Sequence, residues 1–293
     1  MTIHGRLMAC CLALFTAVPA MAANSRAAQG VLLELDAKNH RIVVSCDAIP
    51  GYMDAMAMPF AVRDWAAVRP LKPGATVRFT MVERGREEFA EHLEAVAATN
   101  FEPEPTEAGR LTILHELINP AAAAREVAPG AVVPDFTLTD QAQRATHLEQ
   151  FRGKVVALTF AYARCPNPNY CFKLSNNLWE LTRRFRGKTG DLVLMTIVID
   201  PANDRGKALE SFAETWKADP DQWRFLTGSV TEIESIAELF GMHFWSDEGF
   251  LTHSFHTVVI DRGGRLAGNL EGNQFTAKQL GDLVETVLRR KSN

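Results

Sequence analysis

One feature constrains the fold of this chain most: an apolar run, a loop with two cysteines and a helical pattern follow one another directly. Residues 155–160 read as a buried strand, and Cys165 and Cys171 lie on the loop after it. Apolar residues then recur at helical spacing, at Leu174, Leu178, Leu181 and Phe185. Backbone N–H groups at the start of a helix lower the pKa of nearby thiols. The order therefore predicts sulfur chemistry or soft-metal chemistry at a strand-to-helix junction.

The chain beyond this junction keeps alternating between strand and helix patterns. The pattern predicts strands at 192–199, 223–226, 257–260 and 266–268, and helices near 207–216, 231–240 and 276–289. Strand, helix, strand, helix, hairpin and helix in this order are typical of a thioredoxin-like α/β domain. We place this domain at residues 135–293.

The first third of the chain has a different pattern. Between residues 30 and 82, short alternating apolar runs are separated by turn residues, which predicts a small all-β barrel of the OB-like kind. Residues 87–97 fit either a short helix or an edge strand, and residues 111–117 fit a closing strand. We expect the barrel at residues 30–118 and an alanine- and proline-rich linker at 119–134.

The N-terminus predicts export. Arg6 precedes an apolar stretch that ends in Ala20-Met21-Ala22, which is typical of a signal peptide at residues 1–22 and a periplasmic mature protein. No later stretch is long and apolar enough to span a bilayer, so we expect no stable membrane insertion after cleavage. The net charge of −4, without basic clusters, argues against nucleic-acid binding.

Three cysteines remain after the predicted cleavage: Cys46, Cys165 and Cys171. Three cysteines do not make a disulfide framework, and their odd number favours at least one free thiol. In a thioredoxin-like sheet the strand after His253 is a neighbour of the strand before Cys165, so this histidine should approach the cysteine loop. Two thiolates and an imidazole suit Cu(I) or Cu(II). His253 could equally be a loop histidine that makes its hydrogen bonds within the protein and binds no metal. His256 is a weaker candidate ligand.

Methionines gather after Cys46 in the first domain, at Met53, Met56 and Met58. Met56 and Met58 would face the same side of an extended strand. Thioethers with a thiolate select Cu(I) over zinc and hard cations, although methionines also fill ordinary cores. We interpret the cluster as a Cu(I) site.

At these residues the sequence resembles two known families. Residues 128–293 are similar to the Sco/SenC family in four ordered motifs: the run from Gly153 to Pro166, Ile199-Asp200-Pro201-Ala202-Asn203-Asp204, Phe225-Leu226-Thr227-Gly228, and Thr252-His253-Ser254. Residues 30–82 resemble the CusF-type periplasmic copper-binding domain, through Ile49-Pro50-Gly51-Tyr52-Met53 and Met56-Ala57-Met58-Pro59-Phe60.

The resemblance implies a thioredoxin-like copper metallochaperone with copper on Cys165, Cys171 and His253. For the CusF-like domain it implies Met56 and Met58 as ligands, with Cys46 at the family's histidine position and Met53 near its tryptophan position.

The sequence departs from the Sco/SenC pattern at three places. Five residues separate the cysteines where the family usually has three, Phe172 replaces a common proline, and Thr252 replaces a common aspartate. Loss of that aspartate removes a partner that could orient the imidazole of His253.

Three functions fit these observations. In the first, the barrel passes Cu(I) to the second domain, which delivers copper to an apo-cuproprotein such as a cytochrome c oxidase subunit or reduces the cysteines of its copper site. A thiol reductant is an implied partner, and no enzymatic turnover is needed. In the second, Cys165 and Cys171 act as a thiol-disulfide oxidoreductase or thiol peroxidase. In the third, the protein sequesters copper for resistance.

Asp200 and Asp204 look like a pair of catalytic carboxylates. Their Asp-Pro context after a strand favours a turn or a helix cap instead.

Overall fold

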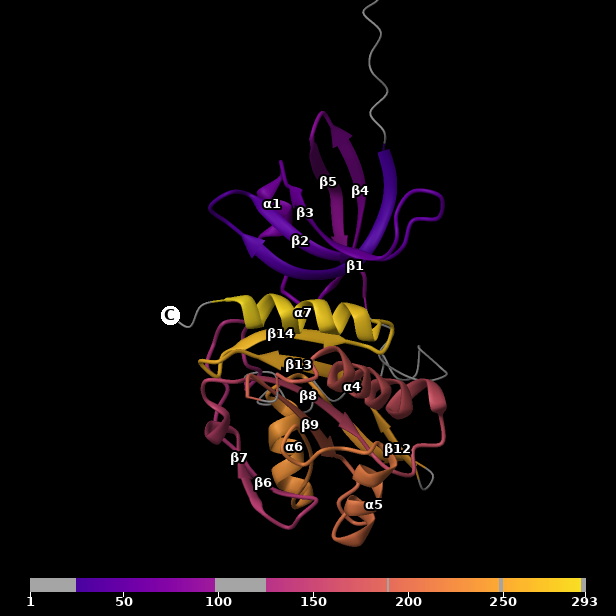
Figure 1. Cartoon of the computed structure of the whole chain (residues 1–293), viewed down its shortest axis with the longest axis vertical. Helices are drawn as coiled ribbons and strands as arrows, with labels where there is room; N and C mark the ends of the chain where they lie inside the picture. The colour runs from indigo at the N-terminus through magenta and orange to yellow at the C-terminus, as the bar shows by residue number, and fades with distance from the viewer. Residues whose placement is uncertain (1–24, 98–124, 189, 248–249, 291–293) are drawn as a thin grey trace, which may run out of the picture.

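The computed structural model describes residues 25–97, 125–188, 190–247 and 250–290. A small β-barrel lies against one side of a larger α/β domain, with the last helix between them (Figure 1). The predicted signal peptide at 1–22 and the predicted strand at 111–117 fall outside the described residues. Within the described ranges, no helix has both the length and the apolar character needed to cross a bilayer.

Five strands close into the barrel in the order β1-β2-β3-β5-β4. They are β1 (Ser25–Asp36), β2 (Arg41–Cys46), β3 (Met56–Ala61), β4 (Thr76–Arg84) and β5 (Glu87–Ala95), with the short helix α1 (Trp65–Val68) after β3. The segment that fitted either a helix or a strand is therefore the strand β5. The barrel interior is filled by alternate residues of the strands, including Leu32, Val44, Phe60 and Val77.

The α/β domain is built on a seven-stranded sheet in the order β14-β13-β8-β9-β10-β6-β7. The strands are β6 (Thr137–Asp140), β7 (Ala145–His147), β8 (Val155–Ala161), β9 (Leu192–Val198), β10 (Trp223–Thr227), β13 (His256–Ile260) and β14 (Leu266–Glu271). A separate hairpin pairs β11 (Phe244–Asp247) with β12 (Phe250–His253). The helical segments are η1 (Leu148–Phe151), η2 (Pro168–Phe172), α4 (Lys173–Arg184), α5 (Lys207–Thr215), α6 (Val230–Glu238) and α7 (Ala277–Arg289).

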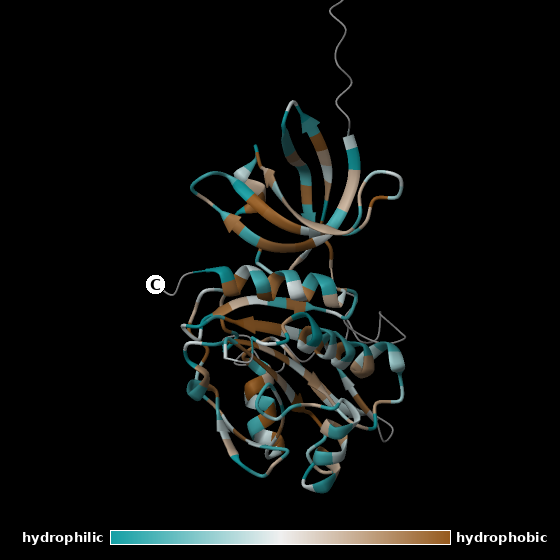
Figure 2. Ribbon diagram, viewed as in Figure 1, coloured by the Kyte–Doolittle hydropathy of each residue, from teal (hydrophilic) through white to brown (hydrophobic). Residues whose placement is uncertain are grey.

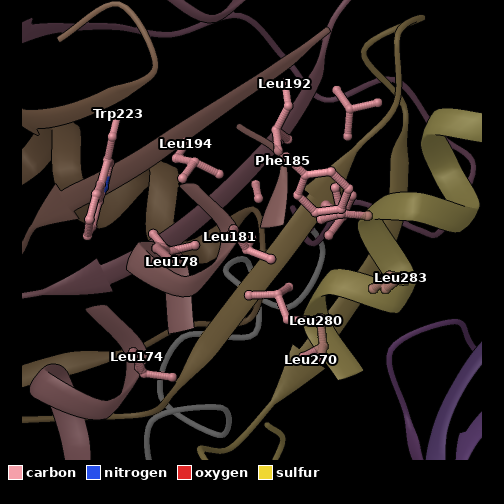
Figure 3. Close-up of a cluster of buried hydrophobic side chains, with 14 of the residues drawn as sticks. Leu174, Leu178, Leu181, Phe185, Leu192, Leu194, Trp223, Leu270, Leu280 and Leu283 are labelled. Carbon is pink, nitrogen blue, oxygen red and sulfur yellow. The ribbon is translucent and has the colours of Figure 1, made fainter. Parts of the chain in front are cut away.

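Two apolar layers hold this sheet between its helices. Every residue of β8 and β9 is buried, as expected for central parallel strands covered on both faces. Figure 3 shows one layer, where leucines of α4 and α7 meet Leu192, Leu194 and Trp223 of the sheet. The other layer packs α6 and η1 against the opposite face. Figure 2 shows the hydrophobic central strands between helices of mixed polarity. The predicted thioredoxin-like fold is confirmed.

The described part of the predicted linker, residues 125–134, lies on the α/β domain. The N–H groups of Val127, Gly130 and Val133 donate to the carbonyls of Leu239, Leu266 and Gly264, at 2.8, 2.7 and 2.9 Å. Val127 and Val133 are also buried in the apolar layer under α6. This segment is therefore an integral part of the second domain's packing.

The barrel and helix α7 share a core. Val31 and Leu33 on β1 point away from the barrel interior and join the apolar cluster that contains Leu280 and Leu283 of α7. Polar contacts surround this core: the hydroxyl of Ser45 donates to the Asp282 carboxylate at 2.7 Å, and both side chains are buried. The two domains are therefore docked on each other and are not merely tethered.

Candidate metal centre

The cysteine loop leads from β8 into α4 through one turn of π-helix, η2. The Asn167 side chain caps this turn by accepting from the N–H of Asn169 at 2.9 Å, and Pro168 occupies its first position. Cys165 precedes the turn and is half-buried, whereas Cys171 lies within it and is 3% exposed. The extra length between the cysteines is thus wound into the π-turn, a form that is frequent at functional sites.

Cys171 and His253 are in contact. The Sγ atom of Cys171 lies 3.6 Å from Nε2 of His253, as expected from the pairing of β8 with β13. The other ring nitrogen, Nδ1, lies 2.9 Å from the carbonyl oxygen of Ser254, which can only accept a hydrogen bond. Nδ1 therefore carries the proton, and the lone pair of Nε2 faces the sulfur. Burial lowers the pKa of His253 to about 4, so the imidazole is neutral at pH 7.

The pKa values of the two thiols in this loop are shifted in opposite directions. A hydrogen bond from the Cys171 thiol, opposed by burial and helped by backbone N–H groups, lowers the pKa of Cys165 to about 6. Burial, together with that hydrogen bond and the nearby Cys165, raises the pKa of Cys171 well above its ordinary value. At neutral pH Cys165 is therefore the thiolate, and Cys171 is the thiol that donates to it.

Aromatic rings enclose the Cys171–His253 contact. The ring centroid of Phe255 lies 4.7 Å from that of His253, and the ring of Tyr162 lies 6.0 Å away, both edge to face. The Tyr162 hydroxyl donates to the carbonyl of Leu251 at 3.2 Å, which holds the His253 strand against the end of β8. These contacts fix the imidazole where the sequence pattern lacks an orienting aspartate.

Asp200 and Asp204 form the predicted turn and also hold the cysteine loop. Asp204 is 1% exposed, and its carboxylate accepts from the N–H of Ala163 at 2.8 Å. Asp200 forms an ion pair with Arg164 at 2.7 Å. Neither carboxylate caps α5, whose N-cap is Gly206, so of the two predicted alternatives, a turn or a helix cap, the structure has the turn. Burial raises the pKa of Asp204 to about 6.

His256, the weaker candidate, has a different partner. Its Nδ1 atom lies 3.1 Å from Oδ1 of Asn269, on the neighbouring strand β14. Among the described residues, no three His, Cys, Asp or Glu side chains converge closely enough to hold a metal ion together. Cys171 and His253 thus form a pair in contact, with Cys165 beside it as a hydrogen-bond partner of Cys171.

The barrel brings the predicted soft donors to one end of β2 and β3. Cys46 is directly opposite Met56 in the antiparallel pairing, and Val44 is opposite Met58. Cys46 is buried, Met56 is 47% exposed, and Met53 and Met58 pack partly buried against the cluster that contains Cys46. Burial and the nearby Asp47 raise the pKa of Cys46 to about 12, so this thiol is protonated at neutral pH.

One short segment before and within α7 supports both thiol motifs. The Asn273 amide donates to the carbonyl of Asn169, between the two cysteines of the loop, at 2.9 Å. Six residues later, the Gln279 amide donates to the carboxylate of Asp47, next to Cys46, at 2.8 Å. Six residues span at most about 20 Å even when fully extended, so the two motifs lie near the same end of α7.

Comparison with known families agrees with this arrangement. The SCO1/SenC family model matches residues 124–289, which is more than half of the chain. The chain belongs to the SCO1/SenC family. A second model, described as copper binding periplasmic protein CusF, matches residues 25–95, the whole described barrel. The Sco/SenC and CusF-like resemblances of the sequence are confirmed.

A curated relative is the SCO1 protein homolog of Bacillus subtilis, which is 30% identical over 106 residues. That match covers 36% of this chain and 54% of the relative, so the chain spans about half the length of the curated relative it matches.

Solved structures also resemble the α/β domain. BsSco, a member of the Sco family of cytochrome c oxidase assembly proteins, has 25% identity, coverage of 56% of this chain and 98% of its own, and a TM-score of 0.49. Copper-bound ScoI of Arabidopsis thaliana has 21% identity, coverage of 55% and 100%, and a TM-score of 0.48. Copper-bound yeast Sco1 has 20% identity, coverage of 55% and 90%, and a TM-score of 0.47.

Proposed function

We propose that this protein is a periplasmic copper metallochaperone that binds copper at Cys165, Cys171 and His253. The contact between Cys171 and His253 carries the proposal, since their ligand atoms are 3.6 Å apart. Two ligands of one trigonal metal, with bonds of about 2.3 Å to sulfur and 2.0 Å to nitrogen as in zinc sites, are roughly 3.7 Å apart. A thiolate, a thiol that can lose its proton and a neutral imidazole are soft and borderline donors that suit copper.

Copper binding at this centre would draw Cys165 toward the Cys171–His253 pair. Cys165 is the more exposed and more acidic thiol, so it would meet incoming copper first and release its own proton most easily. Cys171 would lose its proton on binding, because a thiolate is the metal ligand. The centre can take Cu(I), or Cu(II) with sulfur and nitrogen ligands.

The barrel would hold Cu(I) between Cys46, Met56 and Met58, with Met53 beside them. The register of β2 and β3 supports this set, because Cys46 faces Met56 across the ladder. Thioether donors disfavour Cu(II) at this place. Since both motifs lie near one end of α7, we propose that the barrel site passes its copper to the Cys165 site within one chain.

The acceptor in this proposal is an apo-cuproprotein, such as the copper subunit of a cytochrome c oxidase. The support is that BsSco is described as a member of a family of cytochrome c oxidase assembly proteins. A thiol reductant would keep Cys165 and Cys171 reduced between deliveries. The CusF model, described as periplasmic, supports the location.

Anaerobic Cu(I) titration of the reduced protein against a competing chelator tests this function. The parent protein should bind two tight equivalents. Cys165→Ser/Cys171→Ser should lose one equivalent, and Cys46→Ala/Met56→Ala/Met58→Ala should lose the other. If the Cys165→Ser/Cys171→Ser variant keeps both equivalents, or if the parent binds none, the chaperone proposal fails. Full copper binding by that variant would favour sequestration instead.

A thiol-disulfide oxidoreductase is the second candidate. The divergent thiols favour it: Cys165 has a pKa lowered to about 6, and Cys171 can resolve a mixed disulfide. It predicts catalytic turnover with a disulfide and a thiol reductant in the absence of copper. This reading gives the methionines of the barrel no role.

A further inference from the structure

The hairpin that carries His253 stands apart from the main sheet. Its strands β11 and β12 pair with each other, and in the described part of the chain neither joins the seven-stranded sheet. Phe244, Trp245, Leu251 and Thr252 are partly exposed, whereas every residue of β13 is buried. An isolated two-stranded hairpin is marginally stable in water. The position of His253 therefore depends on the contacts that tie this hairpin to the domain.

The base of the hairpin is closed within its own segment. The N–H of Ser254 donates to the carbonyl of His243 at 2.9 Å, and the N–H of His243 donates to the hydroxyl of Ser254 at 2.9 Å. These two bonds join the ends of the hairpin strands to each other. The tilt of β12 against the end of β8 is therefore left to other contacts.

Tyr162 supplies such a contact from the side of the cysteines. It follows β8 directly, lies three residues before Cys165, and is 4% exposed. Its hydroxyl donates to the carbonyl of Leu251 at 3.2 Å, and its ring meets the His253 ring edge to face at 6.0 Å. Leu251 and His253 are two positions apart, so they lie on one face of β12. Leu251 also packs against the apolar cluster that contains Tyr162 and Cys171. One side chain thus joins the segment of the sulfurs to the strand of the nitrogen.

We propose that Tyr162 is a positioning residue of the copper centre, and that its hydroxyl decides whether the imidazole of His253 belongs to the ligand set. With the bond to Leu251 in place, Nε2 of His253 stays 3.6 Å from Sγ of Cys171, and a nitrogen ligand is at hand. Without that bond, β12 moves away from the cysteine loop, and only the two sulfurs remain. This inference rests on the proposed function, because it names the residue that completes that same centre.

The consequence concerns the oxidation state of the bound copper. Two thiolates suffice for Cu(I), whereas Cu(II) prefers nitrogen ligands beside sulfur. Loss of the hydroxyl should therefore lower the affinity for Cu(II) and leave the affinity for Cu(I) nearly unchanged. A general loss of stability would lower both affinities alike. The difference between the two oxidation states separates positioning from a merely structural role.

Tyr162→Phe tests the proposal with little change in packing, because it keeps the ring and removes the hydroxyl. Thr159→Val is the matched control. It removes the 2.9 Å hydrogen bond between the hydroxyls of Thr159 and Thr257, which is also buried and also reaches from β8 to the segment that follows His253, but it lies outside the hairpin. Both changes are made in the triple variant that lacks the barrel donors, so that all bound copper belongs to one centre.

Hydrogen exchange of the copper-free proteins is the first readout. The amides of residues 250–253 should exchange about fivefold faster in Tyr162→Phe than in the parent, since one net hydrogen bond contributes about 1 kcal/mol. Thr159→Val should leave these rates unchanged. Equal rates in Tyr162→Phe and the parent overturn the proposal, whether or not the protein binds copper.

Copper loading is the second readout. Electron paramagnetic resonance of the Cu(II) form should show nitrogen coupling from the imidazole in the parent and in Thr159→Val. Tyr162→Phe should lose this coupling and keep the thiolate-to-copper absorption. Its affinity for Cu(II) should fall about fivefold, while its affinity for Cu(I) should stay within about twofold of the parent value.

The outcomes separate this inference from the function on which it rests. A parent that binds no copper would defeat the proposed function and this inference together. Copper binding by the parent, with the nitrogen coupling retained in Tyr162→Phe, defeats the inference alone.

Discussion

The Nε2 atom of His253 faces the Sγ atom of Cys171 across 3.6 Å, with both side chains buried. The imidazole reaches this position from β12, while the sulfur comes from the π-turn after β8. The carbonyl of Ser254 fixes the ring tautomer, so the nitrogen lone pair is presented to the sulfur before any metal arrives. In the proposed copper centre, His253 would therefore need little reorganisation on binding, whereas Cys165 would have to move toward the pair.

The first prediction concerns the acidity of Cys165. Its pKa is lowered to about 6, so its alkylation by iodoacetamide should rise with pH around a midpoint near 6. Cys171→Ala removes the thiol that donates to Cys165, the main cause of the lowered pKa, and should move the midpoint upward by at least about one unit. Mass spectrometry of the Cys165 peptide after timed alkylation measures both midpoints. An unchanged midpoint in Cys171→Ala would contradict the assigned cause.

The second prediction separates the two candidate histidines. His253→Ala should weaken Cu(II) binding by at least about tenfold, because it leaves only sulfur ligands at the centre. Cu(I) affinity should fall less, since two thiolates remain. His256→Asn is the matched control: it changes a buried histidine three residues away that bonds Asn269, and it should leave both affinities close to the parent values. The reverse order of effects would move the ligand assignment to His256.

The third prediction concerns the buried carboxyl of Asp204. Its folded-state pKa is raised to about 6 from 3.8, so the folded protein binds this proton more tightly than the unfolded chain does. The contribution of this group to stability therefore grows as pH falls through about 6 and is complete below 3.8. Asp204→Asn should remove up to about 3 kcal/mol of this pH dependence. Urea unfolding at pH 7 and pH 4 measures the difference between variant and parent.

Asp204→Asn should also loosen the cysteine loop, because the Ala163 N–H would then donate to a neutral amide oxygen, which is a weaker acceptor than a carboxylate. Hydrogen exchange of that amide should become faster in the variant. Arg164→Gln removes the ion pair between Arg164 and Asp200, in which the arginine is exposed. It should lower the free energy of unfolding by less than about 1 kcal/mol, as is usual for surface ion pairs. Equal exchange of the Ala163 amide in parent and Asp204→Asn would count against this loop contact.

The fourth prediction addresses the shared core between the domains. Leu33 is 0% exposed and lies in the cluster under α7, so Leu33→Ala should lower the free energy of unfolding by about 2–5 kcal/mol. Calorimetry should show the barrel and the α/β domain melting together in one transition in the parent. Leu93→Ala is the control, since Leu93 on β5 packs against the barrel core and is outside the cluster under α7. Two separate transitions in the parent would refute the shared core.

Much of the α/β domain could be predicted from the sequence because its signals are local. The apolar runs of β8 and β9 and the leucine spacing of α4 specify their elements directly. The position of His253 beside the cysteine loop followed from the neighbouring strands of the fold. The π-turn could not be predicted, because the sequence between the cysteines shows only that the loop is long.

The sequence of β1 carries a pattern that indicates the docking of the barrel on the second domain. Residues Val31, Leu32 and Leu33 form a continuous apolar run, and all three are buried. A strand that covers a barrel on one face only should alternate, so this run indicates burial on both faces. The Ser45–Asp282 and Gln279–Asp47 contacts join residues more than 230 positions apart, and no local pattern predicts such pairs.

The shared core makes the barrel a poor candidate for excision. Val31 and Leu33 would become a bare apolar strip on β1 if the barrel were produced without α7. A copper-binding module cut from this chain would therefore self-associate unless polar residues replaced both side chains. Transplanting the barrel onto another carrier would require a helix with the apolar face and the glutamine and aspartate of α7.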